Sequence, residues 1–360
     1  MLRSATMLRP DARMNRDAVR GGALLRTLVA LLLLAVAAAA WAWTDYQRFT
    51  GTALPIARAD ATIEVPRGSS YPLIVAELRR QDIAGHGLRD GLYWRALGRE
   101  LGVAGRLHAG EYALTQGITP RELLRKMAAG DVVQHRFTIV DGWTFRQLRL
   151  ALANEGGLQQ TLPGSSDEDI ARRVGIEDGR PEGWFLPETY AWVKGESDFD
   201  VLQRAHAAMQ KALERLWPAR SADARLDTPY QALVLASIVE KETAQPAERA
   251  QIAGVFMRRL KFGMRLQTDP TVIYGMGENY AGNIRRSDLE ADTPYNTYTR
   301  DGLPPTPIAL PGTVALEAAL HPAPGDALYF VARGDGSHEF SPTLDAHNRA
   351  VQKFQLHRAQ

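Results

Sequence analysis

The longest apolar run of the chain lies near the N-terminus, from Thr27 to Trp43, and reads TLVALLLLAVAAAAWAW without a charge. Arg26 precedes it, and Asp45 follows two residues after its end. A helix needs about 17 to 25 such residues to cross the hydrocarbon core of a bilayer. Trp41 and Trp43 stand where aromatic residues mark the membrane interface. The pattern predicts a single transmembrane anchor over residues 27–45.

The segment before this run predicts the orientation of the anchor. Residues 1–26 carry six arginines against two aspartates, and basic flanks stay on the cytoplasmic side. We therefore expect a cytoplasmic basic tail over 1–26 and the body of the chain on the far side of the membrane. A cleaved signal peptide and a buried core helix are the alternative interpretations of the run.

After the anchor, three stretches repeat one local design, namely a β-prone run, a glycine turn, a hydroxyl cap and an amphipathic helix. They cover residues 61–80, 110–130 and 137–156, with turns at Gly68, Gly117 and Gly142. Such units are typical of small carbohydrate-binding modules of the LysM type, and they also occur widely in other α+β domains. We expect a stalk and a LysM-like α+β module over 46–156 and a second domain over 157–360.

A helix in the second domain carries an acidic residue on its apolar face. Thr228, Pro229 and Gln231 form a helix start signal, and ALVLASIVEKETA follows over 232–244. At about 100° per residue, Glu242 lies near the centre of the apolar stripe, whereas Glu240 lies on the opposite, solvated face. Burial raises the pKa of a carboxyl group, which suits a general acid. The pattern thus favours Glu242 as the acid, or as a residue at an exposed helix end, with Glu240 as the second choice.

Three clusters mix aromatic and polar residues, in the ranges 182–192, 265–277 and 294–308. Aromatic rings stack on the apolar faces of sugars, while amide, hydroxyl and carboxylate groups bind sugar hydroxyls. The clusters therefore favour a glycan-binding groove. Ordinary turn chemistry accounts for the same Asp-Pro and Gly-Leu-Pro-Pro sequences without any ligand.

Composition narrows the classes of function. The chain has 360 residues, 45% hydrophobic and 23% charged, with no cysteine, which are globular values that exclude disulfides and thiolate chemistry. The net charge is +2, and the body beyond the basic tail is slightly negative, so a nucleic-acid partner is not expected. Neither a metal-binding histidine motif nor a nucleotide-binding glycine motif is present, and we expect no metal and no cofactor.

The motifs ASIVEKETA, LQTDPTVIYGMG, YNTYTRDGLPPTPI and EGWFLPETY together resemble those of the endolytic murein transglycosylase family, also called YceG-like. The resemblance extends over nearly the whole chain from Thr27 onward. It implies an α+β protein with one N-terminal transmembrane helix, a small LysM-like module and a mixed α+β catalytic domain. It also implies a bacterial inner-membrane enzyme whose periplasmic part cuts nascent peptidoglycan strands, terminates their elongation and associates with peptidoglycan synthases.

The resemblance also implies the chemistry. One glutamic acid protonates the β-1,4 oxygen between N-acetylmuramic acid and N-acetylglucosamine, and the same carboxylate then accepts a proton from the muramyl C6 hydroxyl. The product is a 1,6-anhydro end, formed without water. The family's catalytic residue falls on Glu242, in the pair Glu242-Thr243, which agrees with the helix periodicity.

By the same resemblance, nine residues are expected to line the glycan groove. One wall would be formed by Gln267, Thr268, Asp269, Tyr274, Asn296 and Tyr298, and the other by Glu188, Thr189 and Tyr190. The family often has Asp-Thr-Tyr where this chain has Glu188-Thr189-Tyr190.

Two rival functions remain at this stage. A muramidase or glucosaminidase would use water and two carboxylates, with Glu188 or Asp269 as the second. A non-catalytic scaffold would bind murein and recruit synthases without cutting the glycan.

Overall fold

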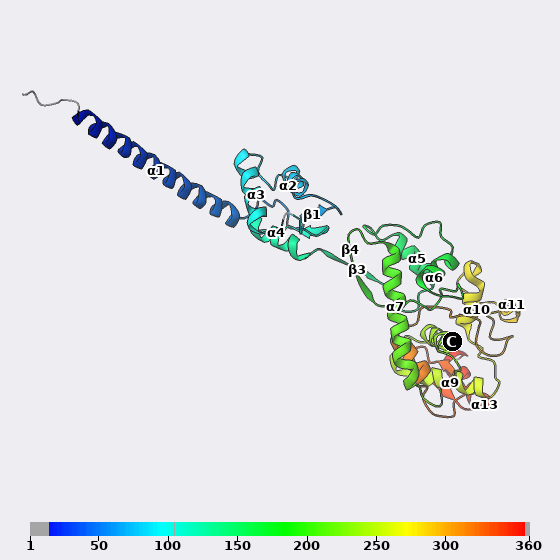
Figure 1. Ribbon diagram of the computed structural model, residues 1–360. Coiled ribbons are helices and arrows are strands. Elements are labelled where there is room, and N and C mark those ends of the chain that lie inside the picture. Colours follow the sequence, from blue (N-terminus) through cyan, green and yellow to red (C-terminus); the bar gives the residue numbers. More distant parts are fainter. Residues whose placement is uncertain (1–13, 104, 357–360) are drawn as a thin grey trace, which may run out of the picture. The chain divides into compact units, whose positions relative to one another are not determined.

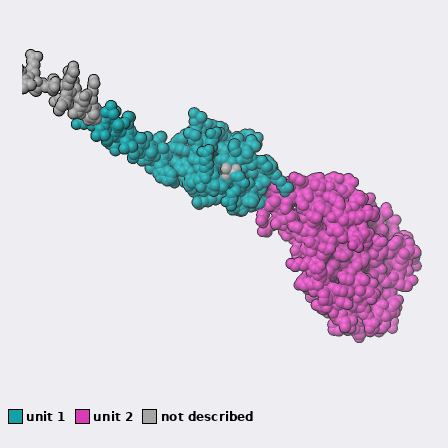
Figure 2. Space-filling view, viewed as in Figure 1, with its two compact units in different colours: residues 1–133 teal, residues 134–360 magenta. Residues whose placement is uncertain are grey.

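The structure is a computed structural model that describes residues 14–103 and 105–356 (Figure 1). Half of the expected basic tail, residues 1–13, lies outside the described residues. The chain divides into two compact units, residues 1–133 and 134–360, which Figure 2 colours separately. Each unit is described by itself below.

The first unit begins with the long helix α1 (Met14–Gly51). Its stretch from Leu24 to Gly51 is long and apolar enough to cross a membrane by length and composition. The residues of the apolar run are exposed on the helix surface. The sequence prediction of one apolar helix near the N-terminus is therefore confirmed.

The end of α1 packs into the first unit, where a stalk was expected. Tyr46 and Thr50 are buried, and the Tyr46 hydroxyl donates a hydrogen bond to Glu100. Leu54 continues this attachment, because its backbone N–H donates to the Ile118 carbonyl at 2.8 Å. Apolar residues at the start of the expected stalk therefore pack on the module.

The body of the first unit consists of two strands and three helices, which are β1 (Thr62–Val65), α2 (Tyr71–Arg80), α3 (Leu88–Glu100), β2 (Gly110–Ala113) and α4 (Pro120–Ala129). The strands pair antiparallel, so the order is strand, helix, helix, strand, with α4 added. The helices cover a core centred on Trp94, Tyr112 and Leu123. The start of α4 is a capping box, in which Thr119 and Glu122 satisfy each other's backbone N–H groups.

The third predicted repeat, 137–156, belongs to the second unit. Its strand β3 (Gln134–Thr138) pairs antiparallel with β4 (Thr189–Val193). At the start of its helix α5 (Phe145–Ala153), the Phe145 ring stacks on Phe185 with centroids 5.1 Å apart. The division by contacts therefore falls at residue 133, whereas the sequence pattern placed it at 156, because the partner strand lies some fifty residues further along the chain.

The rest of the second unit is mainly helical, with one more two-stranded sheet formed by β5 and β6. Its elements are α6 (Asp167–Val174), α7 (Asp198–Leu216), η1 (Trp217–Ala219), α8 (Pro229–Glu242), η2 (Pro246–Glu248), α9 (Arg249–Lys261), α10 (Asp269–Met276), η3 (Gly277–Asn279), α11 (Arg286–Glu290), α12 (Thr313–Leu320), β5 (Tyr329–Ala332), β6 (His338–Ser341), α13 (Leu344–Val351) and η4 (Gln352–Leu356). A mixed α+β fold is therefore confirmed.

Helix α8 lies at the centre of the second unit. Every residue from Ala232 to Glu240 is buried, and α9, α10 and α12 contact the helix. A helix buried on all sides has no solvated face on which to place a charge. This packing decides the roles of its two glutamates.

Glu240 is buried, so the prediction that it lies on a solvated face was wrong. Its side chain forms an ion pair with Arg249 of α9 at 2.6 Å and is only 4% exposed. Its other carboxyl oxygen accepts a hydrogen bond from the Gly312 backbone N–H at 3.0 Å. Glu240 therefore joins α8 to the starts of α9 and α12.

We expect Arg249→Met to lower the free energy of unfolding by about 3 to 5 kcal/mol, because the Glu240 carboxylate would stay buried without its partner. Urea denaturation followed by tryptophan fluorescence measures this loss. The double variant Glu240→Gln, Arg249→Met is the control, and it should recover most of the stability because the unpaired charge is gone. A single variant as stable as the unmodified chain would contradict the structural role.

Gly183 supports a close approach between the 182–185 turn and α8. Its φ is +84°, and an added Cβ would lie 2.5 Å from Pro307 and 3.3 Å from Leu233. Gly195 has a similar φ of +94°, with nothing within 4 Å of an added Cβ. An alanine at Gly195 would therefore experience backbone strain only, whereas an alanine at Gly183 would also overlap with Pro307.

We expect Gly195→Ala to destabilise the chain by about 1 kcal/mol, the cost of a left-handed conformation for alanine. Gly183→Ala should lose about 1 to 3 kcal/mol more, because the overlap with Pro307 adds strain. Thermal unfolding of both variants gives the comparison. Equal losses would mean that the turn moves away from Pro307 without cost.

Candidate active site

Glu242 is the last residue of α8. Thr243 leaves the helical conformation with φ −144° and ψ 136°, so the Glu242 side chain stands where the chain departs from the buried helix. Carbonyl groups at a helix C-terminus disfavour a negative charge. The position therefore favours the protonated form of the carboxyl group.

The Thr268 hydroxyl donates a hydrogen bond to the Glu242 carboxylate. Thr268 is buried and immediately precedes α10. Its backbone N–H donates to the Thr297 hydroxyl at 3.0 Å, and its carbonyl accepts from Thr271 at 2.8 Å. These buried hydroxyl groups hold Thr268 against Glu242.

The pKa of Glu242 is raised to about 7, mainly by burial and in part by the charge of Asp269. The Thr268 hydrogen bond and the charges of His338 and Arg259 act in the opposite direction. Glu242 keeps part of its surface, although protein surrounds its carboxyl group. The result is an acid that holds its proton near neutral pH yet remains at a surface.

Two further predicted residues lie beside Thr268. Asp269 is the first residue of α10, and its carboxylate accepts a hydrogen bond from the Tyr298 hydroxyl at 2.6 Å. Gln267 has a left-handed backbone with φ +51°, which is uncommon for a residue other than glycine. The structure therefore brings Gln267, Thr268, Asp269 and Tyr298 together around Glu242.

Asn296 is 1% exposed, and its polar atoms bond within the chain. Its amide nitrogen donates to the carbonyls of Asp288, Leu289 and Ala291, and its amide oxygen accepts from the Tyr298 N–H at 2.9 Å. These bonds shape the loop that presents Tyr298. Asn296 thus supports the site from behind its surface.

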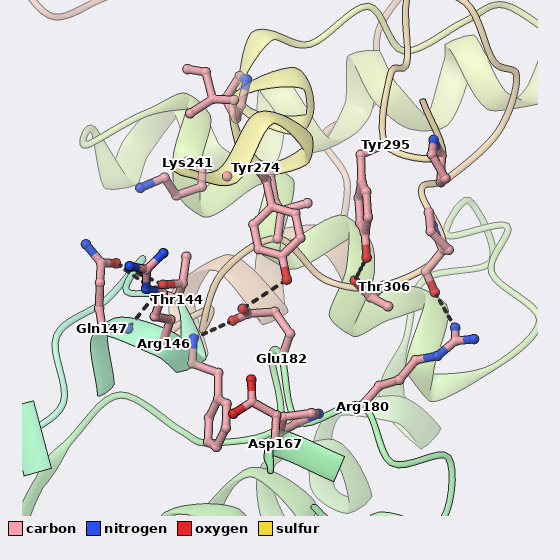
Figure 3. A pocket seen from close by; sticks show the side chains of 18 of the residues that line it. Thr144, Arg146, Gln147, Asp167, Arg180, Glu182, Lys241, Tyr274, Tyr295 and Thr306 are labelled. Carbon is pink, nitrogen blue, oxygen red and sulfur yellow. Dashed lines mark hydrogen bonds between the residues drawn. The ribbon is translucent and has the colours of Figure 1, made fainter. Parts of the chain in front are cut away.

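A cavity of about 1230 Å³ lies beside α10 (Figure 3). Its lining includes Lys241, which precedes Glu242 in the sequence, and Pro270, which follows Asp269. Glu242 itself does not line the cavity. Tyr274 lines the cavity and donates from its hydroxyl to Glu182 at 3.1 Å. Glu182 and Tyr274 thus belong to the cavity wall, whereas Glu242 does not.

Glu182 is a second buried acid, which the sequence analysis did not single out. It is 7% exposed and accepts hydrogen bonds from the Phe145 N–H at 2.9 Å and from Tyr274. Burial raises its pKa to about 7, against the effect of these hydrogen bonds. The sequence signal for Glu182 was its position directly before Gly183 and the aromatic residues that follow.

The three residues predicted for the opposite wall lie elsewhere. Glu188 lines a separate cavity with Lys211 and Arg215. The hydroxyl of Thr189 lies 2.9 Å from that of Thr138 across the β3–β4 pair, and Tyr190 is buried with its hydroxyl on the Leu186 carbonyl. The structure does not join these three residues to Glu242.

The site offers an acid but no group of metal ligands. Within residues 14–103 and 105–356, no three His, Asp or Glu side chains lie close enough together to hold a metal ion. The carboxyl of Glu242 has one hydrogen-bond donor, on Oε1, and in the described part of the chain Oε2 accepts no hydrogen bond. A neutral carboxyl group with an oxygen to spare can donate a proton to a ligand and take one back.

Comparison with known proteins places this geometry in a family. The model of the YceG-like family matches residues 63–353. A Bacillus subtilis (strain 168) protein named endolytic murein transglycosylase is 30% identical over 314 residues, which span 82% of this chain and 85% of that protein. A Streptococcus pneumoniae (strain D39) protein of the same name is 26% identical, over 90% of this chain and 64% of its own length.

A solved structure agrees with the sequence matches. The crystal structure of a putative yceG-like protein from Listeria monocytogenes has a TM-score of 0.50 and 28% identity to this chain. It matches over 80% of this chain and 98% of its own. The match of the family model over most of the length, together with these relatives, shows that the chain belongs to the YceG-like family.

Proposed function

We infer that this chain is an endolytic murein transglycosylase that cuts peptidoglycan strands at the β-1,4 bond between N-acetylmuramic acid and N-acetylglucosamine. The family match and the names of the relatives support this inference. The observation that carries it is the environment of Glu242, a carboxyl group with a pKa raised to about 7 and held by Thr268. This is the protonation state that a general acid needs at neutral pH.

In the proposed mechanism, Glu242 acts twice. It first gives its proton to the glycosidic oxygen, the bond between that oxygen and C1 of the muramyl residue breaks, and Glu242 becomes a carboxylate. The muramyl C6 hydroxyl then attacks C1 and returns its proton to Glu242. The products are a 1,6-anhydromuramyl end and a free hydroxyl on the leaving sugar, and water is neither used nor released.

The residues around Glu242 have different roles in this proposal. Thr268, Asp269 and Tyr298 stand beside the acid and contact the glycan near the cleaved bond. Gln267 shapes the turn before them, and Asn296 shapes the loop that carries Tyr298. Tyr274 lines the cavity beside α10, where the strand continues.

The proposal includes the cellular setting that the sequence indicates. Helix α1 spans the bacterial inner membrane once, with its N-terminus in the cytoplasm and the catalytic unit in the periplasm. The strand, helix, helix, strand order of the first unit supports a LysM-like module that binds glycan. The resemblance to the family extends the proposal to association with peptidoglycan synthases.

We expect Glu242→Gln to reduce cleavage of isolated peptidoglycan strands by about 100-fold or more, because the amide cannot donate the proton. The folded state should persist, since the two side chains are nearly equal in size. Glu214→Gln, on the exposed side of α7, is the matched control and should cleave at the normal rate. Mass spectrometry of the products, with the full chain in detergent, measures both.

The mass of the new ends distinguishes the possible reactions. Internal fragments with anhydromuramyl ends, lost in Glu242→Gln, are expected. Reducing ends, each one water heavier, would indicate a hydrolase and require a second carboxylate, for which Asp269 is the candidate because its charge acts on Glu242. Binding of strands without any cut would favour the scaffold.

Activity and stability should both depend on the protonation of Glu242. Because the reaction begins with the protonated acid, kcat/KM is expected to fall as the pH rises through about 7. The folded-state pKa lies above the ordinary value of 4.5, so the unfolded chain releases this proton first and stability declines between those two pH values.

Glu242→Gln should remove part of this decline, by up to about 3 kcal/mol. Thermal unfolding at pH 5 and at pH 8 compares the variant with the unmodified chain. The remaining decline is expected from Glu182, whose pKa is also raised to about 7. An identical pH dependence in both proteins would be inconsistent with a raised pKa at Glu242.

A further inference from the structure

Arg259 is a buried cation without a carboxylate partner. It lies on α9 and is 8% exposed, and within the described residues it forms no ion pair. Arg249, the other buried arginine of the same helix, pairs with Glu240 at 2.6 Å. Burying a guanidinium group is unfavourable unless other groups compensate its charge. The surroundings of Arg259 therefore require an explanation.

The guanidinium group of Arg259 holds the turn that leads into the site. Its Nη1 donates to the carbonyl of Leu266 at 2.8 Å, to that of Arg265 at 3.2 Å and to the side-chain oxygen of Gln267 at 3.3 Å. Its Nε donates to the Leu328 carbonyl at 2.7 Å. The residue after this turn is Thr268, the hydrogen-bond partner of Glu242.

Four ionisable groups from other elements act on the Glu242 carboxyl group. Asp269 and Tyr298 surround it from α10 and the following loop, and His338 and Arg259 act from β6 and α9. His338 has its own acidic partner, Glu248, at 2.7 Å. On α8 itself, Glu240 is paired with Arg249, and the side chain of Lys241 donates to the Gly142 carbonyl.

Arg259 differs from these groups in two respects. An arginine side chain keeps its charge at every pH of interest, and among the described residues no carboxylate forms an ion pair with Arg259. Arg259 therefore attracts Glu242 electrostatically when the Glu242 carboxyl group is negatively charged.

We propose that Arg259 is the counter-charge of Glu242, which holds the Arg265–Gln267 turn in place and stabilises the carboxylate that forms when Glu242 gives up its proton. The proposal rests on the proposed function, in which that carboxylate exists between the two proton transfers. Arg259 is a positioning residue, because it acts through Glu242 and the turn.

The test measures the charge of Glu242 directly. The full chain in detergent, with ¹³C at the side-chain carboxyl carbons of glutamate, is titrated by NMR, and the Glu242 signal is identified by its loss in Glu242→Gln. In Arg259→Gln the midpoint should rise by about half a pH unit or more, because a nearby positive charge is removed. In Arg259→Lys, which keeps the charge, the midpoint should stay near that of the unmodified chain.

Arg258→Gln is the matched control. Arg258 is the neighbouring residue on α9, and it also donates to backbone carbonyls, those of Ala327 at 2.7 Å and Ala323 at 3.1 Å. It does not act on Glu242. The Glu242 midpoint should be unchanged in this variant, so a shift in both glutamine variants would indicate a general loss of packing and would overturn the proposal.

The kinetic counterpart is the pH dependence of kcat/KM. The alkaline limb should move upward with the NMR midpoint in Arg259→Gln and stay in place in Arg259→Lys. A folded Arg259→Gln protein with an unchanged midpoint would overturn the proposal and leave Arg259 as a support of the turn. The titration does not require cleavage. If Arg259→Gln shifts the midpoint but the unmodified chain cuts no glycan, the proposed function is refuted and the electrostatic role of Arg259 stands.

A chain that fails to fold as Arg259→Gln also decides the question. The same substitution is then made together with Glu242→Gln, which removes the carboxylate that would lack its counter-charge. Recovery of folding, followed by circular dichroism, supports the proposal. A double variant that still fails to fold would show that the turn needs the guanidinium group irrespective of Glu242. This result would overturn the proposal.

Discussion

The hydrogen bond from Thr268 to Glu242 is the contact on which the arrangement of the site depends. It joins the C-terminus of α8, the most buried helix of the second unit, to the N-terminus of α10. Helix α8 is fixed because its neighbours enclose it, and Thr268 is fixed because Thr271 and Thr297 bond to it. The acid is therefore held from both sides, by a buried helix and by a buried hydrogen-bonded threonine. Loops alone would not provide such a constraint.

Glu182 and Glu242 of the second unit both have a pKa raised to about 7, and their hydrogen bonds indicate different roles. Glu182 uses one oxygen for the N-terminus of α5 and the other for Tyr274 of α10, so it connects two walls of the cavity. Glu242 has a single donor, Thr268. A carboxyl group with both oxygens engaged is suited to hold structure, whereas one with an oxygen to spare can meet a substrate. The pKa alone would not separate the two residues.

The sequence located Glu242 correctly in the last turn of its helix, but the argument from one apolar stripe does not describe α8. The helix is buried on all sides, and Glu240 is compensated by Arg249 and Gly312, which lie 9 and 72 residues away. Helix periodicity contains no information about such distant partners. The same limit explains Tyr190, whose aromatic ring suggested a sugar platform although it packs in the core. Residues adjacent in sequence, such as Gln267, Thr268 and Asp269, need no such information, because chain connectivity alone keeps them together.

The first unit shows how a single helix can serve two surroundings. The apolar run of α1 exposes its side chains along the helix, and directly after Asp45 the same helix buries Tyr46 against α3. Glu100 accepts from Tyr46 and also pairs with Arg121 of α4, so the helix end is bound to two other helices. In the proposed orientation, no flexible segment separates the membrane-spanning part from the module. The membrane would then fix the height of the module above the bilayer.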